Sequence, residues 1–300
     1  MSSKDLPRVG CIGLGMMGRP IANHLMTAGY ELTLYARRPE VFENELKFLI
    51  DAGAAIAASP SDLALRVDII LLNVMAGPDV RKLILDGPDS IASTARPGLI
   101  VVDHSTIDPA TARDVHTALK EVGAGYVDAP VSGGAVGAEA GTLAVMMGGD
   151  EEDIGKILPL LEHYSAKRLH MGASGQGSIT KLTNQIAQVI TIEGVAEAMR
   201  FAQAHGADLE AVRDVLMSGF AGSRMLELLG PKMISRDYTP GMESRLLDKD
   251  IQIAGLSALA EGLSLPALDL LQKQISRLQE YGWQKEDISI LYEALDRKKI

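Results

Sequence analysis

The most informative segment for the fold is Val9-Gly10-Cys11-Ile12-Gly13-Leu14-Gly15-Met16-Met17-Gly18. It reads as a short apolar strand that runs into Gly-x-Gly-x-x-Gly and then into a helical pattern. Gly13 permits the tight turn, Gly15 leaves room for a pyrophosphate, and Gly18 lets the helix sit close on the strand. Unpaired N–H groups at the start of such a helix bind phosphate. We therefore expect Gly13, Gly15, Met16, Met17 and Gly18 to contact a dinucleotide.

A lone glycine triplet also fits a purely structural turn. Here a strand precedes the triplet, a helix follows it, and a second apolar run at residues 31–35 comes next. This order is the one that a dinucleotide-binding unit requires, and it favours the cofactor interpretation.

The first 170 residues alternate short apolar runs with amphipathic segments. Strands that are apolar throughout and alternate with helices indicate a mostly parallel sheet with helices on both faces. We predict strands at Val9–Ile12 and at residues 31–35, 68–73, 99–103, 125–128, 143–147 and 167–171. We predict helices at residues 16–28, 40–51, 61–66, 109–122 and 151–161. The fold class is therefore α/β, with a Rossmann-like doubly wound sheet.

The pattern changes after residue 171. Residues 172–175 are small and read as a hinge, and one long helix without proline then runs from Gln176 to about His205. Further helices are predicted near residues 208–217, 246–261 and 266–281, and no further strand is expected. Two domains follow from this: an NADP-binding Rossmann-like domain at residues 1–173, and an all-helical substrate and oligomerisation domain at residues 174–300.

Composition limits the class of partner. The chain has 29 basic and 39 acidic side chains and a net charge of −10, so on average it repels nucleic acid and membrane surfaces, and neither is expected as a partner. The single cysteine, Cys11, lies in an apolar run and is expected in the core. The chain shows no signal peptide and no apolar run of about 20 residues, which predicts a soluble, cytoplasmic protein.

Two arginines stand where cofactor preference is decided. The second predicted strand ends at Tyr35-Ala36-Arg37-Arg38-Pro39, where an NAD-selective site carries a carboxylate for the ribose hydroxyls. This chain has no acid there before Glu40. Guanidinium groups suit bidentate contact with a 2′-phosphate, and we expect one of the pair, but not both, to point into solvent. Arg37 and Arg38 therefore favour NADP(H) over NAD(H).

Polar residues also follow two later strands. Ser105 or Thr106 could hydrogen-bond the nicotinamide side of a cofactor, because ligands of such sheets lie beyond the carboxyl ends of the strands. Capping the next helix is an equally good use for either residue. In Asp128-Ala129-Pro130-Val131-Ser132-Gly133-Gly134, a hydroxyl and unobstructed N–H donors suit a substrate carboxylate, although an ordinary glycine-rich loop fits equally well.

The long helix carries a polar stripe on a mostly apolar surface. Lys181, Asn184, Gln185 and Gln188 share one face, at spacings of three, four and seven from the lysine. Such a stripe is either a solvated edge or a buried functional seam. A solvated edge would mix Glu with Lys, so amides beside a single lysine favour a site.

These residues form part of a resemblance to the β-hydroxyacid dehydrogenase family, which includes 3-hydroxyisobutyrate dehydrogenase and tartronate semialdehyde reductase. The resemblance extends over nearly the whole chain, through Leu247-Asp248-Lys249-Asp250 to Asp287-Ile288-Ser289. It rests on five ordered motifs: G-L-G-x-M-G-x-P at residues 13–20, D-x-S-T-x-x-P at 103–109, D-A-P-V-S-G-G at 128–134, G-T-L-A-V-M-M-G-G at 141–149 and G-x-x-x-K-L-x-N at 177–184.

The resemblance implies a role for each matching residue. The catalytic residue is Lys181. The substrate is bound by Ser132, Gly133, Gly134 and Asn184. The cofactor is contacted, besides the glycine turn and the two arginines, by Val74, Met75, Thr106 and Lys249. Many relatives have Leu-Pro where this chain has Val74-Met75-Ala76, which puts the shape of that loop in doubt rather than the activity. The resemblance also implies a homodimer or homotetramer that shares the long helix.

The implied reaction interconverts a small β-hydroxyacid and its semialdehyde. Hydride transfer to the aldehyde leaves negative charge on oxygen, which the Lys181 ammonium stabilises and protonates. In the oxidising direction the amine must be neutral, so desolvation must lower its pKa from about 10.4. The Lys-x-x-Asn-Gln form at residues 181–185 is similar to tartronate semialdehyde reductases, which favours 2-hydroxy-3-oxopropionate reductase.

Several alternatives stay open at this point. A 3-hydroxyisobutyrate, 4-hydroxybutyrate/glyoxylate or serine dehydrogenase fits the same motifs. An imine reductase is disfavoured because Lys181 stands where those enzymes usually have Asp or Tyr, and a non-enzymatic cofactor-binding module because the lysine is retained. No metal is expected, since the sequence has no His/Asp/Glu cluster with ligand spacing.

Overall fold

The computed structural model describes residues 6–296 of the chain. The chain divides into two compact units, Met1–Lys181 and Leu182–Ile300. The division lies inside helix α8 (Gln176–Ala204), later than the boundary predicted at residue 173. The roles assigned to the two domains stay predictions.

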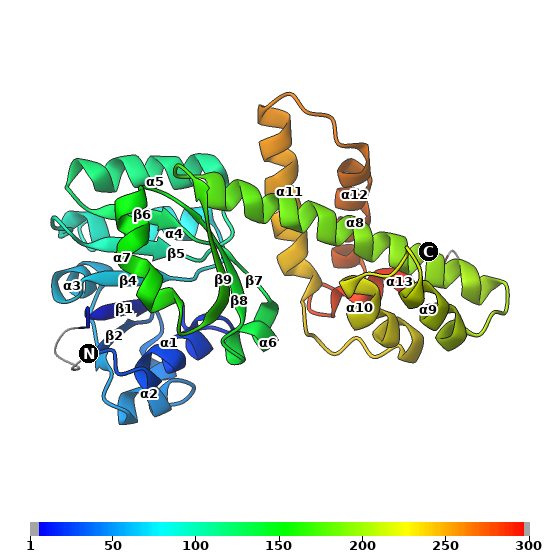
Figure 1. The fold of residues 1–300 in the computed structure, drawn as a ribbon, viewed down its shortest axis with the longest axis horizontal. Coiled ribbons are helices and arrows are strands. Elements are labelled where there is room, and N and C mark those ends of the chain that lie inside the picture. Colours follow the sequence, from blue (N-terminus) through cyan, green and yellow to red (C-terminus); the bar gives the residue numbers. More distant parts are fainter. Residues whose placement is uncertain (1–5, 297–300) are drawn as a thin grey trace. The chain divides into compact units, whose positions relative to one another are not determined.

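The first unit is built on a mostly parallel sheet (Figure 1). In the described part of the chain this sheet has nine strands in the order β3-β2-β1-β4-β5-β6-β8-β7, with β9 paired to β8. The pairs from β3 to β6 are parallel, whereas β8 runs antiparallel to β6 and β7. The strands are β1 (Val9–Ile12), β2 (Leu32–Tyr35), β3 (Ala55–Ile56), β4 (Ile69–Leu72), β5 (Ile100–Asp103), β6 (Gly125–Asp128), β7 (Val131–Ser132), β8 (Leu143–Gly148) and β9 (Ser165–Gly172). The predicted Rossmann-like α/β fold is confirmed.

Alternate side chains of the central strands enter two separate cores. In β4, Ile69 and Leu71 pack with helices α1, α2 and α7, whereas Ile70 and Leu72 pack with α3, α4 and α5. This period of two explains why the strands read as continuous apolar runs, because both faces of the sheet are covered. The helices are α1 (Gly18–Thr27), α2 (Lys47–Asp51), α3 (Pro60–Arg66), α4 (Gly77–Ile84), α5 (Pro109–Glu121), α6 (Gly134–Glu139) and α7 (Glu151–Leu161).

The helix predicted at residues 40–51 is wrong as a single element. The segment contains a 3-10 turn, Pro39–Phe42, followed by the short α2. The Asn44 side-chain amide donates to the Glu40 carbonyl (2.9 Å), the acceptor that an α-helix would offer to the Asn44 backbone N–H. Local side-chain bonds of this kind compete with the helix.

Two short strands and two α-helices of the first unit were not predicted. Strands β3 and β7 have two residues each, too few for a period to appear. Helix α4 begins Gly77-Pro78, which reads as a loop, although proline is well tolerated in a first helical turn. Helix α6 begins at one glycine with positive φ, Gly134, and follows another, Gly133.

The second unit is helical (Figure 1). Its core is formed by α8 residues beyond Lys181 together with the later helices. These are α9 (Leu209–Ser218), α10 (Arg224–Ser235), α11 (Ser244–Ala260), α12 (Pro266–Glu280) and α13 (Leu291–Ala294). Helix α10 was not predicted because Gly230-Pro231 reads as a breaker; buried Leu226, Leu229 and Met233 hold it on the core. Within residues 6–296, no helix combines the length and the apolar character needed to cross a membrane.

Candidate active site

In the glycine turn after β1, the middle glycine has space for a side chain, whereas the first and the third do not. A Cβ on Gly13 (φ 84°) would lie 1.9 Å from the Asn73 carbonyl oxygen, and a Cβ on Gly18 would lie 2.3 Å from the Gly13 carbonyl oxygen. At Gly15, by contrast, a Cβ would meet nothing within 4 Å, and the residue is exposed. Packing therefore requires Gly13 and Gly18, whereas Gly15 keeps a surface bare.

The start of helix α1 is open to an anion. Met17 at its N-cap makes no side-chain capping bond, and the first turn carries no acidic residue. The first N–H groups of a helix lack intrahelical partners and carry partial positive charge. With the bare backbone at Gly15 beside them, these features fit a dinucleotide diphosphate.

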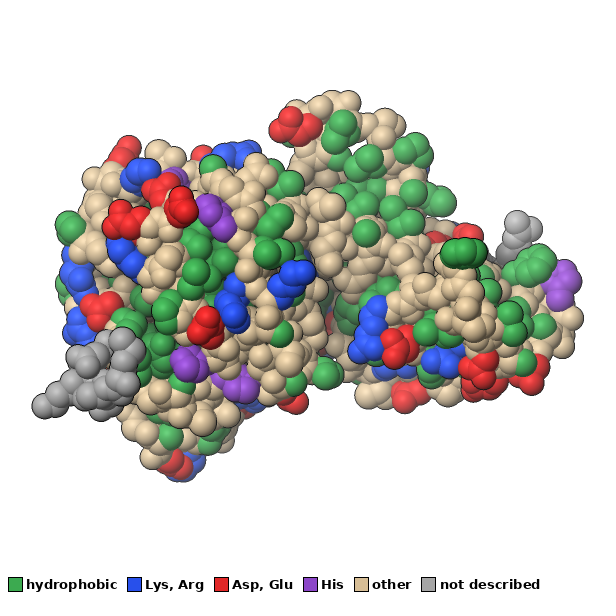
Figure 2. All heavy atoms as spheres, viewed as in Figure 1, with side chains coloured by type: hydrophobic (Ala, Val, Ile, Leu, Met, Phe, Trp, Pro, Cys, Tyr) green, Lys and Arg blue, Asp and Glu red, His purple; other side chains and the backbone are tan. Residues whose placement is uncertain are grey.

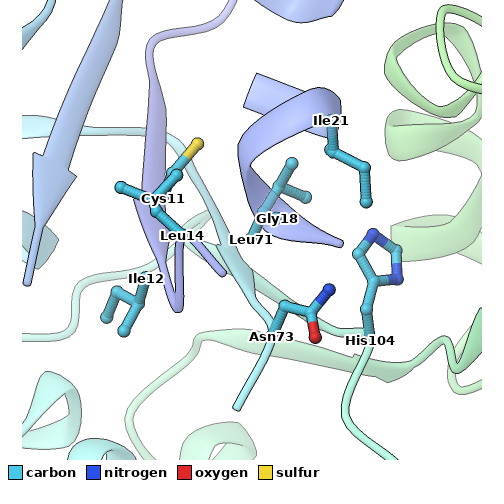
Figure 3. A pocket seen from close by; sticks show the side chains of 8 residues that line it. All are labelled: Cys11, Ile12, Leu14, Gly18, Ile21, Leu71, Asn73 and His104. Carbon is cyan, nitrogen blue, oxygen red and sulfur yellow. The ribbon is translucent and has the colours of Figure 1, made fainter. Parts of the chain in front are cut away.

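A small cavity lies beneath this turn. It is lined by Cys11, Ile12, Leu14, Gly18, Ile21, Leu71, Asn73 and His104 (Figure 3). The Asn73 amide nitrogen is buried and has no hydrogen-bond partner among residues 6–296. Burial raises the pKa of the Cys11 thiol to about 12, which confirms the core position predicted for this residue.

His104 has a structural role in this region. Its Nδ1 lies 2.6 Å from the Ala129 carbonyl oxygen and its Nε2 lies 2.9 Å from the Tyr164 hydroxyl. Burial lowers the pKa of His104 to about 4, so the ring is neutral. Both nitrogens are occupied, which leaves none for a proton transfer to a ligand.

The loops that follow β4 and β5 are bonded to each other. The Val74 backbone N–H donates to Ser105 Oγ (2.9 Å), and the Ser105 N–H donates to Asp103 Oδ1 (2.9 Å). Asp103 Oδ2 accepts from the Tyr126 hydroxyl (2.9 Å). Burial raises the pKa of Asp103 to about 6, and the bonds from Ser105 and Tyr126 oppose this shift. Asp103, which was not among the predicted site residues, thus fixes the shape of both loops.

The helix-capping alternative for Ser105 and Thr106 is wrong. Asp108 is the N-cap of α5, and its side chain accepts from the Thr111 backbone N–H (2.8 Å). Ser105 instead joins the two loops, and Thr106 is half-buried next to it. Of the two loop residues expected to contact cofactor, Met75 is exposed and Val74 half-buried.

The two arginines after β2 lie on an exposed corner. Both Arg37 and Arg38 are exposed, where the sequence predicted that only one would point into solvent. No residue between Leu6 and Asp296 forms a hydrogen bond or ion pair with either guanidinium. Both cationic groups are therefore available to an anionic ligand.

The predicted substrate loop connects β7 to α6. Ser132 is half-buried and pairs with Ala144 of β8, while Gly133 and Gly134 are exposed. Gly133 has φ 133° and Gly134 has φ 61°, conformations that only glycine adopts readily. The loop thus presents its backbone without side chains after the serine hydroxyl.

A remote carboxylate anchors the start of α8. Asp128, at the end of β6, accepts the Gly175 backbone N–H with Oδ1 and the Ser178 backbone N–H with Oδ2, both at 2.8 Å. A Cβ on Gly177 would lie 2.4 Å from the Asp128 carbonyl oxygen and 2.5 Å from that of Met146. The helix therefore starts in backbone contact with the strand ends. Lys181, 9% exposed, lies one turn further along.

One amide of the predicted seam bonds to α11, and a second amide bonds to the first. Gln185, 4% exposed, donates to Asp250 Oδ2 (2.6 Å), and Asn184 Nδ2 donates to Gln185 Oε1 (2.9 Å). Lys249 forms an ion pair with Asp250 Oδ1 (2.9 Å). The solvated-edge alternative is wrong for Lys181 and Gln185, which are buried.

These bonds link two predicted site residues, Asn184 and Lys249, through two that were not selected, Gln185 and Asp250. The polar stripe did include Gln185, so its signal was present in the sequence. Asp250 adjoins Lys249 in the motif, but only the fold brings it to α8.

Comparisons with known proteins agree with these features. Residues 8–172 match the family described as the NAD-binding domain of 6-phosphogluconate dehydrogenase, and residues 175–295 match the family described as NAD-binding of NADP-dependent 3-hydroxyisobutyrate dehydrogenase. The chain is 37% identical to 2-hydroxy-3-oxopropionate reductase of Escherichia coli K12 over 96% of its own length and 97% of the relative's.

Two further similar proteins carry L-serine in their descriptions. The chain is 33% identical to the NAD-dependent L-serine dehydrogenase of Pseudomonas aeruginosa, over 97% of this chain and 98% of that protein. The solved structure of Mycobacterium tuberculosis 3-hydroxyisobutyrate dehydrogenase with L-serine superposes with a TM-score of 0.87 at 27% identity, covering 97% of this chain and 99% of that one.

Proposed function

The chain belongs to the β-hydroxyacid dehydrogenase family of NAD(P)-dependent oxidoreductases, and from that premise we propose that it interconverts a small β-semialdehyde acid and its hydroxyacid with NADP(H). The observation that carries the proposal is the position of Lys181: a nine-tenths buried lysine one turn beyond the anchored start of α8. A desolvated lysine at a fixed position is suited to hold and release a proton.

Each proposed site residue has a defined task. When bound, the nicotinamide cofactor supplies the hydride. Lys181 stabilises the oxygen on which charge develops and gives it a proton, and it takes the proton back in the oxidising direction. The Ser132 hydroxyl and the backbone N–H groups of Gly133 and Gly134 hold the substrate carboxylate, and Asn184 orients the remainder of the molecule.

The cofactor contacts follow from three features of the first unit. The diphosphate would lie on the bare backbone at Gly15 and on the uncapped start of α1, beside Met16 and Met17. Val74, Met75 and Thr106 would border the nicotinamide side, with Lys249 contributed by α11. Arg37 and Arg38 would bind a 2′-phosphate, and this supports NADP(H) as the preferred cofactor.

The substrate that the chain supports best is 2-hydroxy-3-oxopropionate. The support is its 37% identity to the Escherichia coli reductase and the Lys-x-x-Asn-Gln sequence at residues 181–185. Oxidation of L-serine is the second candidate, because a relative of 33% identity is named for it. That relative is NAD-dependent, whereas the arginine corner of this chain lacks the acid that binds the NAD ribose.

A panel of substrates tests the proposal. Reduction of 2-hydroxy-3-oxopropionate, methylmalonate semialdehyde, succinic semialdehyde and glyoxylate, and oxidation of L-serine, are followed at 340 nm with each cofactor. The expected result is the highest kcat/KM for 2-hydroxy-3-oxopropionate with NADPH. Turnover of L-serine with NAD above all aldehydes would favour the second candidate, and no turnover at all would overturn the enzymatic proposal.

Self-association is part of the proposal. Large apolar side chains on α11, on α12 and between them are exposed: Leu256, Leu259, Leu263 and Leu270. Figure 2 shows hydrophobic side chains gathered over these two helices. Contiguous exposed apolar patches mark interfaces, and a homodimer or homotetramer would cover them. Sedimentation velocity measures the oligomeric state directly.

A further inference from the structure

The buried carboxylate of Asp250 decides which way the amides of α8 face. A carboxylate accepts hydrogen bonds and donates none, so Gln185 must turn its NH₂ group toward Asp250 Oδ2 (2.6 Å). Its oxygen then faces Asn184, and Asn184 must donate a hydrogen bond to it from its own NH₂ group (2.9 Å). The orientation of both amides is thereby set from α11.

The Gln188 amide is oriented in the same way, with its oxygen toward Asn184 and its NH₂ group toward Met242. Its NH₂ group lies 3.3 Å from the Met242 sulfur, and its oxygen accepts a second, longer bond from Asn184 Nδ2 (3.4 Å). The hydrogen bonds that run from Asp250 through Gln185 to Asn184 form a relay. An amide nitrogen carries two protons, and Asn184 uses both of them to donate to Gln185 and Gln188. The polar atom of Asn184 that is left for a ligand is Oδ1, to which no residue within 6–296 donates.

We propose that Gln185 is a specificity-determining residue, because it makes Asn184 present an acceptor and so selects substrates that carry a hydrogen-bond donor. This inference rests on the proposed function and concerns the same site. An acceptor oxygen pairs with a hydroxyl or an ammonium on the carbon next to the carboxylate. A methyl group at that carbon leaves the oxygen unpaired, and a buried unpaired acceptor costs binding energy.

The substrate class that follows is a β-semialdehyde acid with a hydroxyl at carbon 2, rather than one with a methyl at that carbon. The two groups are nearly equal in size, so pocket shape alone separates them poorly. A site built to hydrogen-bond a hydroxyl, in contrast, strongly rejects the analogue that lacks it. The relay gives the chain such a site from three side chains: Asp250, Gln185 and Asn184.

The test compares two aldehydes of matched size, 2-hydroxy-3-oxopropionate and 2-methyl-3-oxopropionate, with NADPH. The wild-type chain is expected to prefer the hydroxyl compound in kcat/KM by at least about tenfold. In Gln185→Met, the Asn184 amide is free to turn, so kcat/KM for the hydroxyl compound should fall roughly 10- to 100-fold. The value for the methyl compound should change by less than about threefold. A loss of folded protein would lower both values alike.

Two further variants make the test decisive. Gln203→Met makes the same chemical change on α8 outside the relay, where Gln203 accepts from Arg200 (2.6 Å), and it should leave the ratio of the two kcat/KM values unchanged. Asp250→Asn replaces a group that can only accept by one of equal size that can also donate, so Gln185 is no longer held in one orientation. The variant should lower the ratio as Gln185→Met does, and it is used in place of Gln185→Met if that protein does not fold.

The outcomes separate the inference from the proposed function. Equal use of both aldehydes by the wild-type chain, or a ratio unaffected by Gln185→Met and Asp250→Asn, overturns the inference and leaves the reductase proposal in place. Failure to reduce any semialdehyde with either cofactor overturns the proposed function, and the inference with it.

Discussion

Asp128 accepts the backbone N–H of Ser178 at 2.8 Å, although 50 residues separate the two in sequence. Its other carboxylate oxygen accepts from Gly175, so a side chain at the end of β6 caps the first turn of α8. Because Lys181 lies one turn beyond Ser178, this carboxylate is a positioning group for the proposed proton donor.

Asp128→Asn should weaken this anchor. Each carboxylate oxygen of Asp128 accepts from a backbone N–H, and Oδ1 also accepts from the Ser174 hydroxyl (3.5 Å), so an amide NH₂ would face an N–H donor without an acceptor. We expect a loss of roughly 1–3 kcal/mol in stability and a larger fall in kcat than in NADPH affinity. Thermal unfolding and steady-state kinetics measure the two effects. Asp114→Asn, which removes an exposed surface partner of Arg81, is the control and should change neither. Unchanged melting of Asp128→Asn would show that the anchor is dispensable.

Lys181→Ala tests the proton donor itself. Loss of a positioned acid or base lowers turnover by about 10²- to 10⁴-fold, while NADPH binding, measured by cofactor fluorescence, should stay within about threefold of the wild-type value. Lys167→Ala, at an exposed lysine of β9, should be as active as the wild type. A Lys181→Ala protein that keeps most of its kcat would contradict the assignment.

Gly15→Ala should weaken NADPH binding without loss of stability, whereas Gly18→Ala should lower the stability of the fold. The added methyl group at Gly15 meets no protein atom, so the variant should melt like the wild type but bind NADPH weakly, since the methyl occupies the proposed diphosphate surface. At Gly18 the methyl group would press on the Gly13 carbonyl, and we expect a destabilisation of roughly 1–3 kcal/mol or more. Calorimetric titration and thermal unfolding of both proteins measure this contrast. Normal NADPH affinity in Gly15→Ala would place the diphosphate elsewhere.

The double variant Arg37→Ala, Arg38→Ala should discriminate between the cofactors. Each guanidinium is exposed, and charge-assisted bonds to a 2′-phosphate would be lost with both. The KM for NADPH should rise roughly 10- to 100-fold, and the KM for NADH should hardly change, which makes NADH the internal control. An equal rise for both cofactors would refute the phosphate-binding role of this corner.

Glu193 makes the stability of the second unit depend on pH. Its carboxyl oxygens are buried without a hydrogen-bond partner among the described residues. Burial, assisted by the charge of Glu197, raises the pKa of Glu193 from 4.5 to about 7. Between these values the unfolded chain releases a proton that the folded chain retains, so stability falls as the pH rises from 4.5 to 7 and levels off above.

Glu193→Gln should therefore be more stable than the wild type at pH 8, by up to about 3 kcal/mol, and should lose this advantage near pH 4.5. Urea unfolding across this pH range measures the difference. Glu280→Gln, at an exposed position of α12, should show no such pH dependence. Parallel stability curves for wild type and Glu193→Gln would contradict the buried-carboxyl interpretation.

The sequence predicted the elements whose pattern is long enough to read. The strand at Val9–Ile12 was predicted from a continuous apolar run, and the helix at 109–122, observed as Pro109–Glu121, from its amphipathic pattern. Helices α4 and α10 were missed because each contains a Gly-Pro pair, whose meaning depends on which core side chains lie near it. Local propensity cannot supply that information.

The candidate site was predictable only in its local parts. The glycine turn could be predicted because its signal is the local order of strand, glycine triplet and helix. The hydrogen bonds from the Ser178 N–H to Asp128 and from Gln185 to Asp250 join residues 50 and 65 positions apart. Such pairings depend on topology, so the sequence revealed the polar residues but not their partners.

The position of Cys11 has a practical consequence for measurement. It is the chain's one cysteine, and its buried thiol has a pKa near 12, so almost none is in the reactive thiolate form at neutral pH. A cysteine introduced at any exposed position would then be the single site that a maleimide dye labels. Distances and cofactor-induced rearrangements can thus be followed by fluorescence in a chain whose native thiol needs no replacement.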